Sequence, residues 1–306
     1  MAAGDLLTAD GQIEWRGTIL GRSSPYGWDE LTGWFDLPAQ RGSNAPLSGF
    51  HGSFPGRKVS TDRIVTWNYK SRAAGLGAFQ TAMDELRRIT APTEDPVEEP
   101  LVIRLDGESL LAWARCTRRI IPTGRHYGLG RAHGSLQWEA TDPRLYLVDE
   151  QSESTRLATP AGGGLDFSSG GLDFGSGGLD FGTGVTGGRL IATALGHVPT
   201  WPRLEILGPV VGPLISFPGD RQLRFAPTFA VAAGQKVVIS TQPSLRTVEV
   251  MLASATTGVN VKSQLWTKEW TPLLPGVPTE IRYAVQDASN YNADTTLTAW
   301  WRSAKH

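Results

Sequence analysis

The sequence predicts a mainly β protein with two domains, and three observations support this prediction. Glycine (36 residues) and proline (20) are abundant, and turn residues recur between short β-forming runs. The chain has 306 residues, 40% of them hydrophobic, which is enough for two ordinary domains. Only one segment has the apolar spacing of a helix. We therefore expect a β-rich first domain over residues 1–150 and a β-sandwich over 188–306.

The first domain begins with two strand patterns separated by a loop-rich stretch. Residues 12–20 alternate in part between apolar and polar side chains, as a half-buried strand does. The following stretches, SSPYGWDELTGW and PLSGFHGSFPGR, carry the Gly and Pro of tight turns. Residues 57–70 predict one long strand or two, and the side expected to face the core holds Val65, Trp67 and Tyr69.

A single helix is expected near residues 77–90. Its apolar side chains recur at spacings of three and four, and charged residues occupy the opposite side. This apolar stripe consists of Phe79, Met83, Leu86 and Ile89. Pro92 ends the helix, because proline lacks the N–H group that a helix interior needs.

The first domain ends with two further strand pairs. An acidic loop, TEDPVEEP, leads into two apolar runs on either side of Asp106 and Gly107, which predicts a hairpin. Strand patterns near residues 132–140 and 144–148 follow and complete the domain.

Between the domains, residues 163–184 repeat Gly-Gly-Leu-Asp-Phe three times at a period of seven. In an extended strand the Leu and Phe of each unit share one face, and the Asp lies on the other. We expect the connector, residues 151–187, to make assembly contacts with its own or a neighbouring subunit through Leu165, Phe167, Leu172, Phe174, Leu179 and Phe181. A duplicated flexible linker is the alternative. Calcium binding is disfavoured, because one carboxylate per seven residues leaves each turn short of oxygen ligands.

The second domain shows eight or so short strand patterns and no helix pattern. Turns such as PGD, AAGQ and LPGV separate them, which predicts two packed antiparallel sheets. Trp266 and Trp270 could either line a sugar-binding surface or fill this core, and packing is favoured. Of Trp300 and Trp301, one is expected to point inward, because neighbouring strand residues face opposite sides.

No residue pattern predicts catalysis, a cofactor or a metal site. The sequence lacks a Gly-x-Ser-x-Gly, a phosphate-cradling and a dinucleotide-binding motif. Its one cysteine, Cys116, lies in a strand pattern and is expected to be a buried structural thiol. No helical His-x-x-x-His pair occurs among the histidines, although His126 and His133 could face each other across a hairpin.

Charge and hydropathy narrow the class of protein further. The 29 basic and 30 acidic residues give a net charge of -1, so no long-range field attracts nucleic acid or an anionic membrane. No stretch has the pattern of a secretory signal or of a membrane span. We expect a chain that folds in the cytosol and binds neither nucleic acid nor the membrane interior.

Several separate stretches, taken in order, resemble one known family. They are GQIEWRGTILG, SSPYGWDELTGWFDLP, HGSFPGR, EEPLVIRL, ATDPRLY, the repeated LDF block, PTWPRLEILGPV and the closing WWR. Together they are similar to the distal tail proteins of long-tailed, non-contractile phages, in the version common in phages of actinobacteria. The resemblance covers nearly the whole chain.

The resemblance implies a structural virion protein rather than an enzyme. Distal tail proteins of this kind form a hexameric ring at the tail tip, with an N-terminal β-rich domain making the ring and a C-terminal galectin-like β-sandwich projecting outward. The ring would join the tail-tube protein to tail hub or host-recognition proteins, after assembly in the host cytoplasm. The alternative function is a carbohydrate-binding module that uses Trp266 and Trp270 at a host surface.

Overall fold

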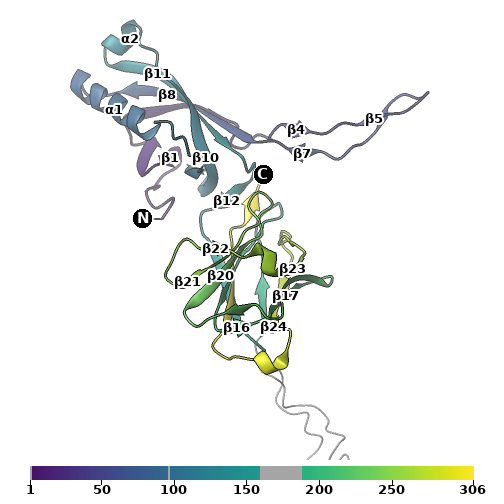
Figure 1. Ribbon diagram of the computed structural model, residues 1–306. Helices are drawn as coiled ribbons and strands as arrows, with labels where there is room; N and C mark the ends of the chain where they lie inside the picture. Colours follow the sequence, from purple (N-terminus) through teal and green to yellow (C-terminus); the bar gives the residue numbers. More distant parts are fainter. Residues whose placement is uncertain (1, 96, 159–187) are drawn as a thin grey trace, which may run out of the picture. The chain divides into compact units, whose positions relative to one another are not determined.

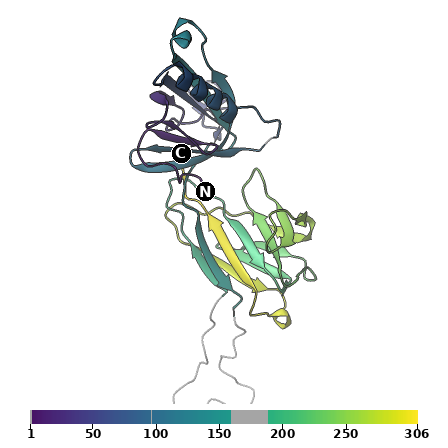
Figure 2. The same ribbon diagram turned by 90° about the vertical axis from the view of Figure 1, so that its left-hand side faces the viewer.

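The chain forms two compact units, each built mainly from β-strands (Figures 1 and 2). The computed structural model describes residues 2–95, 97–158 and 188–306. The first unit comprises Met1–Val148 together with Ala304–His306, and the second comprises Asp149–Ser303. The second unit is therefore an insertion in the chain of the first.

The first unit is built on an antiparallel sheet of nine strands. Seven of them follow the order β2-β1-β9-β10-β11-β8-β3, while β12 pairs with both β10 and β26. The strands are β1 (Gln12–Trp15), β2 (Thr18–Gly21), β3 (Tyr26–Thr32), β8 (Arg63–Arg72), β9 (Glu99–Leu105), β10 (Glu108–Ile120), β11 (Arg131–Ala140), β12 (Leu145–Leu147) and β26 (Ala304–Lys305). β26 comes from the C-terminal end of the chain and pairs with β12. The second unit is therefore inserted between two strands of the first unit.

One amphipathic helix, α1 (Leu76–Ile89), packs on this sheet and confirms the predicted stripe. Its buried side chains join one core with the sheet residues Trp15, Trp67 and Trp138. The Trp15 Nε1 donates to the Ile89 carbonyl at 2.8 Å, and the Tyr26 hydroxyl donates to the Ala82 carbonyl at 2.5 Å. Burial raises the pKa of Tyr26 to about 12, so this hydroxyl stays a donor at neutral pH. A one-turn helix, α2 (Arg125–Gly128), precedes β11.

The turns of the first unit explain where the predicted strands were right and where one was wrong. Residues 12–20 form a hairpin rather than a single strand, because Arg16 and Gly17 adopt φ values of 48° and 71° and reverse the chain. The predicted hairpin at Asp106 and Gly107 is confirmed, with φ values of 53° and 77°. The predicted core side of β8 is also confirmed, since Val65, Trp67 and Tyr69 are all buried.

A two-stranded ribbon, which we call the arm (residues 37–61), projects from the body of the first unit (Figure 1). The ribbon contains β4 (Gln40–Arg41) paired with β7 (Val59–Ser60), and β5 (Ala45–Pro46) paired with β6 (Ser53–Phe54). The Thr61 N–H donates to the Ala39 carbonyl at 2.7 Å, and the Leu47 N–H donates to the Gly52 carbonyl at 3.1 Å. Backbone pairing thus occurs at the base and near the tip of the arm, although the sequence predicted loops for most of this stretch.

The second unit is a sandwich of two antiparallel sheets around one apolar core. The six-stranded sheet contains β13 (Gln151–Arg156), β25 (Thr296–Trp301), β15 (Arg203–Leu207), β20 (Gln235–Ser240), β21 (Val248–Leu252) and β22 (Val259–Asn260). The five-stranded sheet contains β14 (Arg189–Ala192), β24 (Thr279–Val285), β17 (Pro213–Phe217), β18 (Arg221–Phe225) and β23 (Leu265–Lys268). Shorter elements are β16 (Val210–Val211), β19 (Ala230–Val231), and the 3-10 turns η1 (Lys262–Gln264) and η2 (Ala288–Asn290).

Two segments lie in other parts of the fold than the sequence suggested. Residues 151–156, which we expected in the connector, form β13 and pair with β25. This segment, QSESTR, has only Thr155 buried, because it lies at the edge of its sheet and presents mostly polar side chains. Residues 304–306, expected in the sandwich, belong to the first unit instead. There the Lys305 ammonium forms an ion pair of 2.6 Å with Glu108.

Candidate interaction surfaces

A buried arginine fixes the root of the arm. Arg63 begins β8 directly after the arm and is 1% exposed. Its guanidinium donates to the carbonyl oxygens of Gly33, Trp34 and Asp36 at 2.7, 2.7 and 3.0 Å. A fourth bond of 2.7 Å reaches the Pro143 carbonyl. Burial lowers the pKa of Arg63, and these carbonyls replace the water that the cation gives up. The chain entering the arm is thereby tied to the chain leaving it.

The backbone at the same root is closely packed. Gly33 has a φ of 83°, and a Cβ atom at this position would lie 1.8 Å from the Ile64 carbonyl oxygen. Only glycine allows both the positive φ and this close approach. The adjacent Trp34 is 2% exposed and packs in the core of the first unit. The arm therefore leaves the sheet from a fixed position.

The tip of the arm carries exposed aromatic side chains. Phe50 is 80% exposed and Phe54 is 62% exposed on this two-stranded ribbon. Burying a Phe side chain contributes about 1.5–3 kcal/mol of stability. The isolated chain does not gain this contribution from either of the two exposed rings. The arm also contains Arg41, Arg57 and Lys58 but no acidic residue. Its surface is therefore apolar and basic.

The segment after α1 has the opposite charge. Glu98 accepts from the Thr141 N–H at 2.7 Å, and Glu99 pairs with Arg16 at 2.6 Å. Glu94 and Asp95 are exposed, and no hydrogen bond or ion pair engages either within the described part of the chain. Val97 beside them is 64% exposed. We call Glu94, Asp95 and Val97 the acceptor segment, because it combines free carboxylates with an exposed apolar side chain.

In the second unit, the structure distinguishes the two tryptophans that the sequence singled out. Trp266 on β23 is 64% exposed. Trp270 packs against the core, and cationic groups of Arg246 and Lys262 each lie 5.9 Å from the centre of its ring. Such contacts hold an aromatic ring in place. Trp266 alone is therefore a free aromatic surface.

The other tryptophan pair follows the expected alternation. Trp301 is 5% exposed and belongs to the core, so the prediction that one of the two points inward is confirmed. Trp300 faces the other side of β25, where the guanidinium of Arg203 lies 5.4 Å from the centre of its ring.

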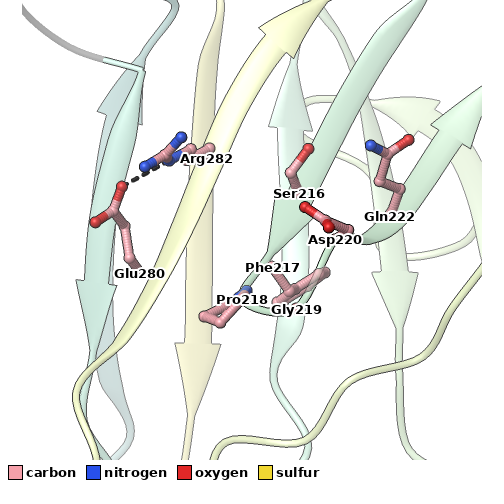
Figure 3. A pocket seen from close by; sticks show the side chains of 8 residues that line it. All are labelled: Ser216, Phe217, Pro218, Gly219, Asp220, Gln222, Glu280 and Arg282. Carbon is pink, nitrogen blue, oxygen red and sulfur yellow. Dashed lines mark hydrogen bonds and ion pairs between the residues drawn. The ribbon is translucent and has the colours of Figure 1, made fainter.

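A polar pocket lies at the turn between β17 and β18 (Figure 3). Figure 3 shows Glu280 and Arg282 on one side of it and Ser216, Asp220 and Gln222 on the other. Glu280 and Arg282 form an ion pair of 2.7 Å with each other. The lining offers hydrogen-bonding groups but no exposed aromatic ring, because the Phe217 side chain is only 4% exposed.

The residues considered for chemistry have ordinary surroundings. Cys116 is half-buried rather than buried, and it lies where β10 bulges between Cys116 and Arg118. Burial raises the pKa of its thiol to about 11, so it is protonated at neutral pH. His126 and His133 are exposed, and no group of three His, Cys, Asp or Glu side chains that could hold a metal ion occurs within the described ranges. No helix in that part of the chain is long and apolar enough to cross a bilayer.

The connector contacts predicted from the Leu-Asp-Phe repeats cannot be placed in this fold. The residues predicted to make these contacts all lie outside the described ranges: Leu165, Phe167, Leu172, Phe174, Leu179 and Phe181.

Comparison with solved structures identifies the fold. Residues along 94% of this chain superpose on 97% of the Dit protein of phage SPP1, with a TM-score of 0.61 and 11% sequence identity. The chain has the Dit fold. That structure is described as a paradigm of the hub adsorption apparatus in phages that infect Gram-positive bacteria. The mainly β fold class predicted from the sequence is confirmed.

Two further solved structures match at a lower level of similarity. Two structures of the phage P2 baseplate in its activated conformation, one with Ca and one with Sr, match with a TM-score of 0.49 and 10% identity. They cover 94% of this chain and 97% and 96% of their own. No protein-family model and no curated protein matches the sequence.

Proposed function

We propose that this chain is a structural component of a phage tail tip, where it forms a ring that joins the tail tube to the tail hub and host-recognition proteins. The Dit fold along 94% of the chain is the observation that carries the proposal, because the SPP1 protein with this fold is described as part of a hub adsorption apparatus. A fold alone does not fix a function. The support here is stronger, because the likeness spans both units and agrees with the family that several sequence stretches resemble.

The ring is proposed to contain six copies, the number that the sequence resemblance implies. It would be built by the first unit, while the second unit would face outward as a galectin-like sandwich. Copies in a closed ring meet through two different patches, one from each neighbour. The first unit offers two such patches, since the arm is apolar and basic and the acceptor segment is acidic.

The proposed role is structural, not enzymatic, and the proposed location is the virion. The partners would be further copies of this chain, the tail-tube protein on one side, and hub or tail-associated proteins on the other.

Light scattering coupled to size exclusion, followed by negative-stain imaging of the full chain, tests this proposal. The expected result is a closed ring, formed by the chain alone or on adding the tail-tube protein of the same phage. A chain that stays monomeric and adds to no tail component would contradict the proposal.

A carbohydrate-binding role for the second unit is the second candidate, and the exposed Trp266 favours it. A free tryptophan ring can stack on a sugar face, whereas Trp270 is held in the sandwich by packing and flanking cations. In glycan-array binding by the full chain, Trp266→Ala should abolish a signal that Trp270→Ala keeps or reduces only through lower stability. Equal binding by the wild type and Trp266→Ala would exclude this site.

A further inference from the structure

We propose that the outer face of the five-stranded sheet in the second unit binds a neutral oligosaccharide. The polar pocket at the turn between β17 and β18 would bind the hydroxyl groups of one sugar, and Trp266 would stack on another sugar of the same oligosaccharide. This inference rests on the second candidate function, carbohydrate binding, and it names the site and the class of ligand. It does not depend on ring formation.

The strand register places three polar pocket residues in one row on this face. Ser216 lies between Ile215 and Phe217, which are both buried in the core of the sandwich, so its own side chain faces away from that core. Its partners on the neighbouring strands are Gln222 and Arg282. Directly paired residues share a face of the sheet. The outer face therefore presents a hydroxyl, an amide and a guanidinium side by side (Figure 3).

A β-bulge brings Trp266 to the same face. The buried residues Phe225 and Leu265 are paired with each other. The next pair is Arg224 with Thr267, so Trp266 is the extra residue of the bulge. In a bulge, two residues oppose one on the neighbouring strand. Trp266 and Thr267 thus lie opposite Arg224, which faces outward because it precedes the buried Phe225.

The distance between the Trp266 ring and the pocket fits an oligosaccharide rather than a single sugar. The Glu269 N–H donates to the Gln222 carbonyl at 3.0 Å, so these two residues lie side by side. Glu269 follows Trp266 by three residues along the chain. At about 3.3 Å per residue and about 4.8 Å between strands, Trp266 lies on the order of 10 Å from Gln222. Two or three linked sugar rings are long enough to reach both.

The pocket has the chemistry of a site for hydroxyl groups. Its volume of about 440 Å³ falls within the range of small-molecule sites. Within the described part of the chain, no side-chain hydrogen bond engages Ser216, Asp220 or Gln222. Gly219 and Asp220 have φ values of 77° and 58°, so a tight turn holds the Asp220 carboxylate at the rim. Hydroxyl, carboxylate and amide groups together can donate to and accept from the hydroxyl groups of a sugar.

Charge favours a neutral ligand over an anionic one. Glu280 and Arg282 form an ion pair with each other, so their charges largely cancel. Asp220 is the remaining charged residue of the pocket lining, and its carboxylate repels a phosphate or an acidic sugar. The Phe217 ring is buried, so the aromatic surface for stacking comes from Trp266.

Glycan-array binding, followed by calorimetry, tests this site in the full chain. The probes are neutral hexose and pentose saccharides of one to four units, and dextran sulfate is the anionic probe. We expect binding of neutral oligosaccharides, with an affinity that increases from one unit to three in the wild type. This increase should be absent in Trp266→Ala, because the shortened side chain offers no ring to a second sugar.

Variants of the pocket give a second readout. Gln222→Leu with Asp220→Gly should weaken binding about tenfold or more, the loss expected for one or two hydrogen bonds. Glycine suits the positive φ at position 220, so the turn is kept. Ser216→Ala removes only a hydroxyl and should weaken binding in the same direction. The matched control is Gln80→Leu, which changes an exposed glutamine on α1 and should bind as the wild type does.

The outcomes separate the site from the functions proposed above. If the wild type binds a neutral oligosaccharide and all the pocket variants bind it equally well, the pocket is excluded while carbohydrate binding stands. Binding of dextran sulfate alone, or no binding by the wild type, would overturn both the site and the carbohydrate-binding role. Light scattering on the same preparations reports on the ring independently of either result.

Discussion

The root and the tip of the arm belong to one ribbon but differ in how they are held. At the root, four carbonyl groups surround the buried Arg63, and Gly33 allows two backbones to approach closely. At the tip, Phe50 and Phe54 are exposed, and backbone hydrogen bonds between the two strands are the main interactions that order the chain. The root is stable within one copy, whereas the tip is left with apolar area that only a partner can cover. The difference shows which part of the arm serves the fold and which part is available for assembly.

The largest effect is expected at Arg63. Arg63→Met leaves the buried Trp34 carbonyl and three partly buried carbonyl groups without their donor, which should lower the free energy of unfolding of the first unit by about 3 kcal/mol or more. Hydrogen exchange of amides in β8 and α1 measures this loss. The exposed Arg57 is the matched control, and Arg57→Met should change protection by less than about 0.5 kcal/mol. Similar losses for both variants would remove the distinction between root and tip.

A smaller effect on stability is expected when either of two glycines with similar φ values is replaced by alanine, and its size should differ between the two positions. Gly33 and Gly49 have φ values of 83° and 78°, but a Cβ would meet the Ile64 carbonyl oxygen at 1.8 Å only in the first case. Gly49→Ala should cost about 1–2 kcal/mol from the φ angle alone, confined to the turn at the tip. Gly33→Ala should add the cost of moving the backbone and destabilise the whole first unit. Exchange of the β8 amides should therefore increase in Gly33→Ala and not in Gly49→Ala.

The smallest effect on stability is expected at the tip. Phe50→Ser and Phe54→Ser remove exposed rings, so the unfolding free energy of the isolated chain should change by no more than about 0.5 kcal/mol. The same variants should weaken ring formation, because each ring is proposed to be buried between copies. A large loss of stability in the monomer would show that the tip already packs on its own copy.

The sequence predicted those parts of the fold in which local pattern and tertiary packing agree. The stripe of α1, the core side of β8 and the hairpin at Asp106 all have a periodicity or a turn signal that the final packing keeps. The strand β13 has neither, since its residues are polar and it lies at the edge of its sheet. The two-residue strand β26 is too short to show any period.

The candidate surfaces were less predictable for physical reasons. The arm contains many Gly, Pro and Ser residues, so its sequence has the composition of a loop, and its ladder is visible only when the two strands are placed side by side. Nothing in the sequence marks Arg63 as buried, because arginine is ordinarily exposed and its acceptors are backbone carbonyls. The sequence does not distinguish Trp266 from Trp270. Only the packing shows that the Trp270 ring lies against the core while the Trp266 ring is exposed.

Hydrogen exchange along the arm, measured in dilute monomer and in the assembled ring, tests the central claim most directly. We predict that amides at the root, next to Gly33 and Arg63, are equally protected in both states, while amides of residues 45–54 are much more strongly protected in the ring than in the monomer. Equal protection of residues 45–54 in monomer and ring would contradict the account, because the tip would then need no partner.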